Sequence, residues 1–119
     1  MRIIIAGSRT ISDYSLLCRA IQESGFVITQ IISGMSRGPD RLSIRYGVEN
    51  KIPIIKVFPD WKTYGKQAGF IRNEQMAKIA DGLIAIWNGY SKGTYHMIRT
   101  AEKKGLKVYI TTVVYPELI

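Results

Sequence analysis

Two short glycine-bearing turns are the parts of this sequence whose residue types most clearly suggest chemistry. One turn runs from Ser33 to Asp40 and the other from Ser91 to Thr94. Each turn follows an apolar, β-branched run and opens a stretch with helical spacing. The N–H groups at such a helix N-terminus point outward, and the helix dipole favours negative charge there. Both turns therefore predict anion sites, and two such sites in one small domain favour a ligand with phosphates, such as a nucleotide.

The residues of these two turns have distinct expected roles. In the first turn Arg37 lies near the anion site, and Asp40 either accepts ribose hydroxyls or only complements the helix dipole. In the second turn the amides of Gly93 and Thr94 suit a phosphate, or Ser91 or Thr94 simply caps the helix. The predicted ligand contacts in the two turns are Gly34, Ser36, Arg37, Gly38, Asp40, Ser91, Lys92, Gly93 and Thr94.

A third candidate turn, Gly7-Ser8-Arg9, follows the first apolar run. Gly7 and Ser8 let the backbone approach a ligand closely, and Arg9 suits a phosphate, although an ordinary turn with an exposed arginine fits the same residues. Neither the GxGxxG nor the GxxxxGK[ST] pattern occurs in the sequence. The sequence therefore disfavours the classical dinucleotide dehydrogenases and the P-loop NTPases.

Polar and aromatic residues outside the turns extend this set of candidates. Trp61 either stacks on a base or seals the core. Arg72, Asn73 and Glu74 share one predicted helical turn. Either they are exposed polar residues at a helix start, or Arg72 turns towards the phosphates of the ligand. We add Trp61, Arg72 and Asn73 to the predicted ligand contacts. Glu74 and Asp40 are the candidates for a catalytic role.

The single histidine and the single cysteine restrict the chemistry further. A metal site or a histidine-based triad needs partners that the chain lacks, so we predict no metal, no cofactor and a surface position for His96. Cys18 lies on an apolar helical stripe, which favours an inert core thiol and excludes an internal disulfide.

The bulk composition describes a globular protein with excess positive charge. Its 119 residues suit one domain spanning residues 1–119, and 46% hydrophobic residues suit a core without disulfides. No apolar run approaches the roughly 20 residues that span a bilayer, so we expect a cytoplasmic protein with no membrane partner. The net charge of +8 favours polyanions, but its scatter along the chain favours a phosphorylated small molecule over nucleic acid.

The apolar pattern predicts alternating strands and helices that position these turns. Most of the strand-like runs are continuous, which indicates a parallel sheet covered on both faces. We therefore predict an α/β fold, a Rossmann-like doubly wound three-layer sandwich with a five-stranded, mainly parallel sheet. The predicted strands are Arg2–Ala6, Val27–Ser33, Pro53–Phe58, Gly82–Trp87 and Lys107–Thr112. The predicted helices run from an N-cap at Ser12 or Asp13 to Gly25, from Pro39 onward, over Ala68–Ile79, and from Tyr95 to Gly105, with Asp60-Trp61-Lys62 in a loop.

Five motifs together resemble a known family. The Ser33–Asp40 turn resembles the GGARGAD turn of the YspA-like (DUF2493) proteins, within the SLOG (SMF/DprA-LOG) Rossmannoid superfamily. Asp60-Trp61, Ala68–Glu74 and Ser91–Thr94 match in the same order, and so does Gly7-Ser8-Arg9. The resemblance covers nearly the whole chain.

The resemblance implies binding of a nucleotide or a nucleotide-derived ligand, by a sensor or a sequestering protein. The ligand would be a signalling nucleotide, an NAD or ADP-ribose derivative, or a nucleoside monophosphate. The LOG branch implies, as an alternative, an N-glycosidase with a PGGxGTxxE signature, whose glutamate position falls here on Met97. The DprA branch implies, as a second alternative, a nucleic-acid accessory protein. We also expect a homo-oligomer, with the apolar tail 113–119 packed on the domain or on a second copy.

Overall fold

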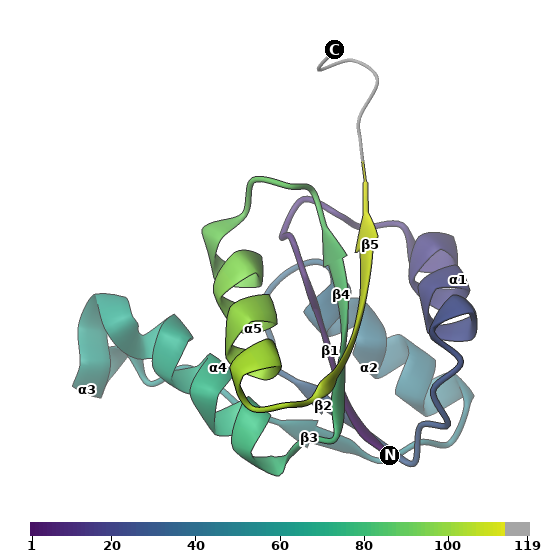
Figure 1. The fold of residues 1–119 in the computed structure, drawn as a ribbon, viewed down its shortest axis with the longest axis horizontal. Coiled ribbons are helices and arrows are strands. Elements are labelled where there is room, and N and C mark those ends of the chain that lie inside the picture. Colours follow the sequence, from purple (N-terminus) through teal and green to yellow (C-terminus); the bar gives the residue numbers. More distant parts are fainter. Residues whose placement is uncertain (114–119) are drawn as a thin grey trace.

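A computed structural model describes residues 1–113, which form one parallel sheet with helices on both faces (Figure 1). The five strands all pair in parallel in the order β3-β2-β1-β4-β5. The predicted α/β fold is confirmed, and the sheet is wholly parallel. The elements in chain order are β1 (Arg2–Gly7), α1 (Tyr14–Ser24), β2 (Gln30–Ser33), α2 (Pro39–Glu49), β3 (Ile54–Lys56), α3 (Trp61–Tyr64), a 3₁₀ turn (Gly65–Gln67), α4 (Ala68–Ile79), β4 (Gly82–Trp87), α5 (Lys92–Lys103) and β5 (Lys107–Thr112).

The strand order places a topological switch between β1 and β4. The chain adds β2 and β3 on one side of β1, and then returns to add β4 and β5 on the other side. Loops that follow β1 and β4 therefore diverge towards opposite faces of the sheet. In open α/β sheets, a crevice for ligands forms at this point, outside the carboxyl ends of the strands.

The continuous apolar strands are explained by two separate cores. Successive side chains of β1 point to opposite faces, so Ile3 and Ile5 pack beneath α1 and α2, while Ile4 and Ala6 pack beneath α4 and α5. Figure 1 shows these two helix pairs on the two faces of the sheet, which completes the predicted three layers. Both faces of the central strands are buried, so apolar residues occupy successive positions.

Local signals in the sequence predicted both ends of α1 and the start of α2, whereas α5 begins at Lys92, three residues before the predicted Tyr95, because Ser91 caps it. The carboxylate of Asp13 accepts from the N–H of Leu16 at 3.2 Å and caps α1, and Gly25, with φ 69°, ends it. Gly38 precedes α2 with φ 85°, and a Cβ there would lie 2.7 Å from the carbonyl oxygen of Ser8. Glycine is therefore required at Gly38 both by conformation and by space.

Two predicted strands, Val27–Ser33 and Pro53–Phe58, were longer than the observed ones. Strand β2 begins at Gln30 rather than Val27, because the paired part of β1 begins at Arg2 opposite Gln30. The side chain of Val27 is 74% exposed. Strand β3 is limited to Ile54–Lys56 because it pairs only with the last three residues of β2. The predicted loop at Asp60-Trp61-Lys62 contains the start of α3, which Asp60 caps by accepting from the N–H of Thr63.

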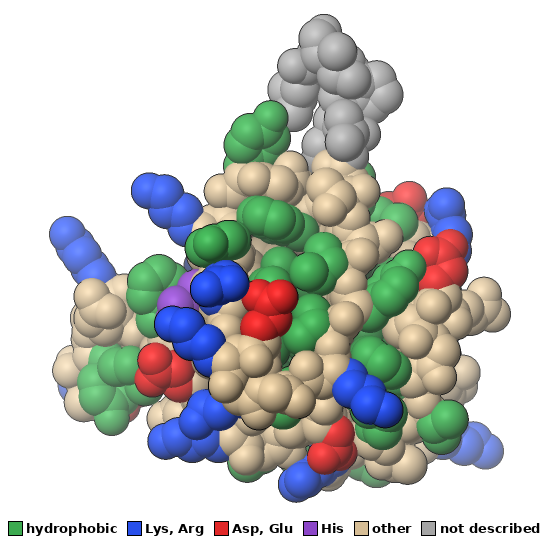
Figure 2. Space-filling model, viewed as in Figure 1, with side chains coloured by type: hydrophobic (Ala, Val, Ile, Leu, Met, Phe, Trp, Pro, Cys, Tyr) green, Lys and Arg blue, Asp and Glu red, His purple; other side chains and the backbone are tan. Residues whose placement is uncertain are grey.

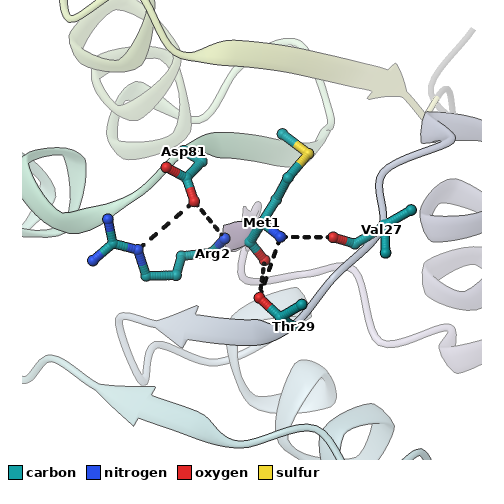
Figure 3. Close-up of polar contacts among 5 residues, drawn as sticks. All are labelled: Met1, Arg2, Val27, Thr29 and Asp81. Atoms are coloured by element: carbon teal, nitrogen blue, oxygen red, sulfur yellow. Dashed lines mark hydrogen bonds and ion pairs between the residues drawn. The ribbon is translucent and has the colours of Figure 1, made fainter.

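Polar contacts at the amino ends of the strands hold the opposite edge of the sheet (Figure 3). The Met1 ammonium donates to the Val27 carbonyl at 2.9 Å and to the Thr29 hydroxyl at 3.2 Å. The carboxylate of Asp81 accepts from the N–H of Arg2 at 2.8 Å and lies 3.7 Å from its Nε. Asp81 therefore links the starts of β1 and β4.

Within residues 1–113, no helix combines the length and the apolar character needed to cross a membrane. Of the tail at residues 113–119, for which packing on the domain or on a second copy was expected, Val113 packs against the core beneath α1 and α2, and residues 114–119 lie outside the described part of the chain.

Candidate functional site

A small open cleft lies at the carboxyl end of the sheet, where the loops after β1 and β4 diverge. Its walls come from the end of β1, the turn after β2 and the first turns of α2, α4 and α5. The glycine-bearing turns and the start of α4 are far apart in the sequence, and they meet in this cleft. The lining residues are Ala6, Gly7, Arg9, Ser36, Asp40, Arg72, Asn73, Ser91, Gly93, Thr94 and Met97.

Asp40 places a buried carboxylate in this cleft. It lies in the first turn of α2, and the residue is only 3% exposed. Burial raises the pKa of Asp40 to about 6, because it disfavours the charged form. The charge of Arg72 and the N–H groups of Gly7 and Ser36 act in the opposite direction and offset part of this effect. Asp40 is thus a carboxyl group that titrates near neutral pH at the wall of an open site.

Arg72 faces Asp40 from α4 and retains an unsatisfied donor. One guanidinium nitrogen donates to the carbonyl of Gly34 at 3.0 Å and to the hydroxyl of Ser36 at 3.1 Å. Its Nε is buried and has no hydrogen-bond partner among residues 1–113. Burial lowers the pKa of Arg72, and the carboxylate of Asp40 opposes that shift. The guanidinium is therefore held in place, while the N–H on its buried Nε has no acceptor among the described residues.

Gly34 leaves room for the side chains of Asp40 and Arg72. A Cβ on Gly34 would lie 2.9 Å from Oδ2 of Asp40 and 3.0 Å from Nε of Arg72. The next residue, Met35, has φ 64°, a conformation that residues other than glycine seldom adopt. The turn after β2 therefore passes close to the side chains of both Asp40 and Arg72.

The N-terminus of α5 forms the opposite wall and is partly occupied by its own cap. The hydroxyl of Ser91 accepts from the N–H of Thr94 at 3.3 Å and from the Thr94 hydroxyl at 3.1 Å. Ser91 therefore caps α5, which was the alternative to phosphate binding at this turn. Gly93 has open space around it, since a Cβ there would meet no atom within 4 Å. At this wall the backbone of Gly93 is the part most accessible to a ligand.

Asn73 and His96 form a contact that the sequence did not predict. Asn73 is 3% exposed, and its Nδ2 lies 3.1 Å from Nδ1 of His96 and 3.3 Å from the carbonyl oxygen of Gly93. The ring of His96 stacks on Phe70, with centroids 4.1 Å apart and an angle of 15° between planes. His96 remains partly exposed at the surface, and α4 covers one side of its ring. The spacing of Phe70 and Asn73, three residues apart on one helix face, is the signal that points to this contact.

Comparisons with known proteins agree with the motifs in this cleft. Residues 1–64 match the model of the family described as "YspA, cpYpsA-related SLOG family". The chain is also 32% identical to the Gene 61 protein of Mycobacterium phage D29 over 119 residues, which cover 90% of this chain and 93% of that protein. The chain belongs to the YspA, cpYpsA-related SLOG family.

A solved structure shares the fold of this SLOG protein at low sequence identity. The DNA processing protein A (DprA) of Streptococcus pneumoniae superposes with a TM-score of 0.72 at 18% identity. The match covers 92% of this chain and 49% of that one, so the SLOG chain spans about half the length of the DprA structure. At this identity the likeness shows the common fold.

Several predicted site residues of the SLOG chain lie outside the cleft lining. Ser8 is buried, and its hydroxyl accepts from the N–H of Asn88 at 3.0 Å, so it joins the loops after β1 and β4. Gly34 and Gly38 do not line the cleft, but each lies where a side chain would collide with neighbouring atoms. The predicted contacts Arg37, Trp61 and Lys92 also lie outside the lining, and their side chains are exposed. The catalytic candidate Glu74 is exposed and outside the lining as well.

Met97 occupies the position where the LOG resemblance places a glutamate, and it lines the cleft as a buried apolar side chain. Among the described residues of the lining, Asp40 is the only acidic one. Any acid–base chemistry carried by the lining of this cleft would therefore have to use Asp40.

Proposed function

We propose that this SLOG protein binds a nucleotide or a nucleotide-derived ligand in the cleft and acts as a sensor or a sequestering protein. The observation that carries the proposal is that Asp40 and Arg72 line the same cleft at the switch point of the sheet, with Nε of Arg72 unpartnered among the described residues. A phosphate oxygen would satisfy the arginine, and ribose hydroxyls would donate to the carboxylate.

The remaining lining residues fit the same ligand chemistry. Arg9 supplies a second positive charge, and Gly7 and Gly93 permit close backbone approach. Arg37, Trp61 and Lys92 remain part of the proposal as residues that would contact a ligand extending beyond the cleft.

Calorimetry with a panel of phosphorylated ligands tests this proposal. The panel contains ADP-ribose, NAD, nucleoside monophosphates and cyclic nucleotides. We expect one of them to release heat with the wild type, and Arg72→Ala and Gly93→Asp to weaken its binding at least tenfold. Open space surrounds Gly93, and a carboxylate suits the first turn of a helix, so Gly93→Asp should leave the fold intact.

The matched control removes a positive charge outside the cleft. Arg99 is exposed on α5 and pairs only at the surface with Glu102, at 3.6 Å. Arg99→Ala should bind the ligand like the wild type. Circular dichroism verifies that all variants are folded. Absence of heat from the wild type with every member of the panel would contradict the proposal.

An N-glycosidase is the alternative that Asp40 favours. A buried carboxyl group with a pKa of about 6 is suited to proton transfer near neutral pH, or to stabilising an oxocarbenium-like state when ionised. Incubation with nucleoside monophosphates and NAD, followed by chromatography, would show release of free base. Release by the wild type that Asp40→Asn abolishes would support catalysis, whereas intact substrate after long incubation would exclude it for these compounds.

A nucleic-acid accessory role is the alternative that the surface around α3 favours. Phe58, Trp61 and Tyr64 are 64%, 52% and 44% exposed, and Lys62 and Lys66 lie among them. Aromatic and basic side chains together suit single strands, and DprA is named as a DNA processing protein. In Figure 2, however, Lys and Arg side chains are spread around the edge of the face rather than gathered in one tract.

The proposal also includes a cytoplasmic location and a homo-oligomer. A single cysteine suits a reducing compartment. Edge strand β5 carries Ile110, which is 40% exposed, on the side of the sheet where a second copy could pack. Light scattering at several protein concentrations measures the mass, and a monomer at all concentrations would contradict the oligomer.

A further inference from the structure

The contact between His96 and Asn73 fixes the protonation state of the histidine ring. Asn73 Oδ1 accepts from the guanidinium of Arg72 at 3.4 Å, and Nδ2 donates to the carbonyl oxygen of Gly93 at 3.3 Å. A guanidinium can only donate and a carbonyl can only accept, so these partners determine which way the amide points. The NH₂ group of Asn73 therefore faces Nδ1 of His96, and Nδ1 must accept. The ring is neutral, with its proton on Nε2.

This contact links His96 to the cleft without placing it in the lining. Asn73 joins the ring to Arg72, and Arg72 in turn holds Gly34 and Ser36 in the turn after β2. The same amide holds the carbonyl of Gly93, in the first turn of α5. One buried side chain thus connects both walls of the cleft to the only histidine of the chain.

Protonation of His96 would set two donors against each other. An N–H on Nδ1 would face the NH₂ group of Asn73, and turning the amide over would instead bring that NH₂ group against Arg72. Burial of the ring lowers the pKa of His96. Among the charged groups that face the ring, Glu74 of α4 favours the protonated form and Lys103 of α5 opposes it.

We propose that neutral His96 is a positioning residue that, through Asn73, holds Arg72 and the first turn of α5 in the arrangement that takes a phosphate-bearing ligand. Protonation of His96 at acidic pH then loosens this arrangement and weakens binding. The inference rests on the proposed function and adds a pH-dependent control to the same site.

The tautomer of His96 can be measured without any ligand. Because the chain has one histidine, ¹⁵N-labelled histidine gives a single ring in long-range proton–nitrogen NMR spectra. At pH 7.5 we expect an unprotonated Nδ1 and a protonated Nε2. A proton on Nδ1 would overturn the inference, whether or not the protein binds nucleotides.

Binding at two pH values tests the consequence for the cleft. ADP-ribose is a suitable probe because its pyrophosphate does not titrate between pH 5.0 and pH 7.5. We expect the wild type to bind it about tenfold more weakly at pH 5.0 than at pH 7.5. His96→Leu, which removes the acceptor, should bind weakly at both values. His96→Asn supplies an amide oxygen near the place of Nδ1 and should restore the binding that the leucine variant loses.

The asparagine variant also separates His96 from Asp40. Both the wild type and His96→Asn keep the titration of Asp40, so only the difference between their pH profiles reports on His96. Equal pH profiles for these two proteins would overturn the inference, and so would wild-type affinity in His96→Leu at pH 7.5. If the wild type binds no ADP-ribose and no other member of the panel, the proposed function and this control of it fail together, and the spectrum alone then decides the tautomer.

Discussion

Asp40 places a carboxylate in the interior with only part of its charge compensated. In the unfolded chain its pKa takes the ordinary value of 3.8, and in the folded protein burial raises it to about 6. Between these values the folded state binds more protons than the unfolded state, so the contribution of Asp40 to stability falls as pH rises through this window. The retention of a destabilising group at the wall of a cleft is typical of a functional residue.

Asp40→Asn should therefore change how stability depends on pH. The difference between the two pKa values corresponds to about 3 kcal/mol at most. We expect the free energy of unfolding of the wild type to fall relative to Asp40→Asn by up to this amount between pH 4 and pH 7.5. Urea denaturation at several pH values measures it. The control is Asp60→Asn, which alters an exposed cap that asparagine also supplies. A constant difference between wild type and Asp40→Asn would contradict the assignment.

The sequence was informative about single residues where their role depends on local geometry. Glycine at Gly34 and Gly38 marked turns that have no room for a side chain. The surroundings of Glu74 and His96 could not be predicted in this way, because they depend on how α4 and α5 are rotated about their axes. That rotation is set by packing on the sheet, so Glu74 lies at the surface while His96 is stacked against Phe70.

At the scale of elements, the ends of α1 and of strands β4 and β5 followed from the sequence, whereas those of β2 and β3 did not. A helix end is satisfied by neighbouring residues, as Asp13 and Gly25 show for α1. A strand end depends on the partner strand, so the exposed Val27 could not be excluded from β2 until the register with β1 was known. The short α3 was missed for another reason, since a four-residue helix has too little periodicity to detect.

The caps of α1 and α3 should differ in their effect on stability. Helix α1 buries Leu17, Ala20 and Ile21, whereas α3 has no buried residue. Removal of the cap by Asp13→Ala should lower the free energy of unfolding by about 1 kcal/mol. Asp60→Ala should instead open α3 locally and leave global unfolding nearly unchanged, because α3 can separate without exposing the core.

Two measurements distinguish these outcomes. Urea denaturation followed by circular dichroism gives the global free energy of unfolding, and hydrogen exchange at the N–H of Tyr64 reports opening of α3. We expect faster exchange at Tyr64 only in Asp60→Ala. Equal global losses in the two variants would mean that α3 is part of the cooperative core.

At the scale of the molecule, the parallel topology explains why the predicted turns converge. All five strands run the same way, so every loop after a strand leaves from one edge, and the switch between β1 and β4 opens the cleft there. The spacing of strands and helices was enough to predict this edge. It could not predict which residues of each loop enter the lining, because Ser8 turns inward to Asn88 while Arg9 lines the cleft.

The net charge of +8 acts on the whole molecule, and salt dependence separates its effect from that of the cleft. A nucleotide held by Arg9 and Arg72 neutralises one or two charges, so log K for ADP-ribose should fall with log salt with a slope of about −1 to −2. A single strand that contacts about six phosphates would give a slope near −4. Titrations between 50 and 300 mM salt measure both.

The double variant Lys62→Gln, Lys66→Gln then assigns each slope to its surface. It should leave ADP-ribose binding unchanged, because neither lysine lines the cleft. It should reduce the slope for the strand by about 1.4 if the strand lies on the aromatic and basic surface around α3. Strand binding with this behaviour, together with no binding of any mononucleotide or ADP-ribose, would favour the nucleic-acid alternative over the nucleotide site.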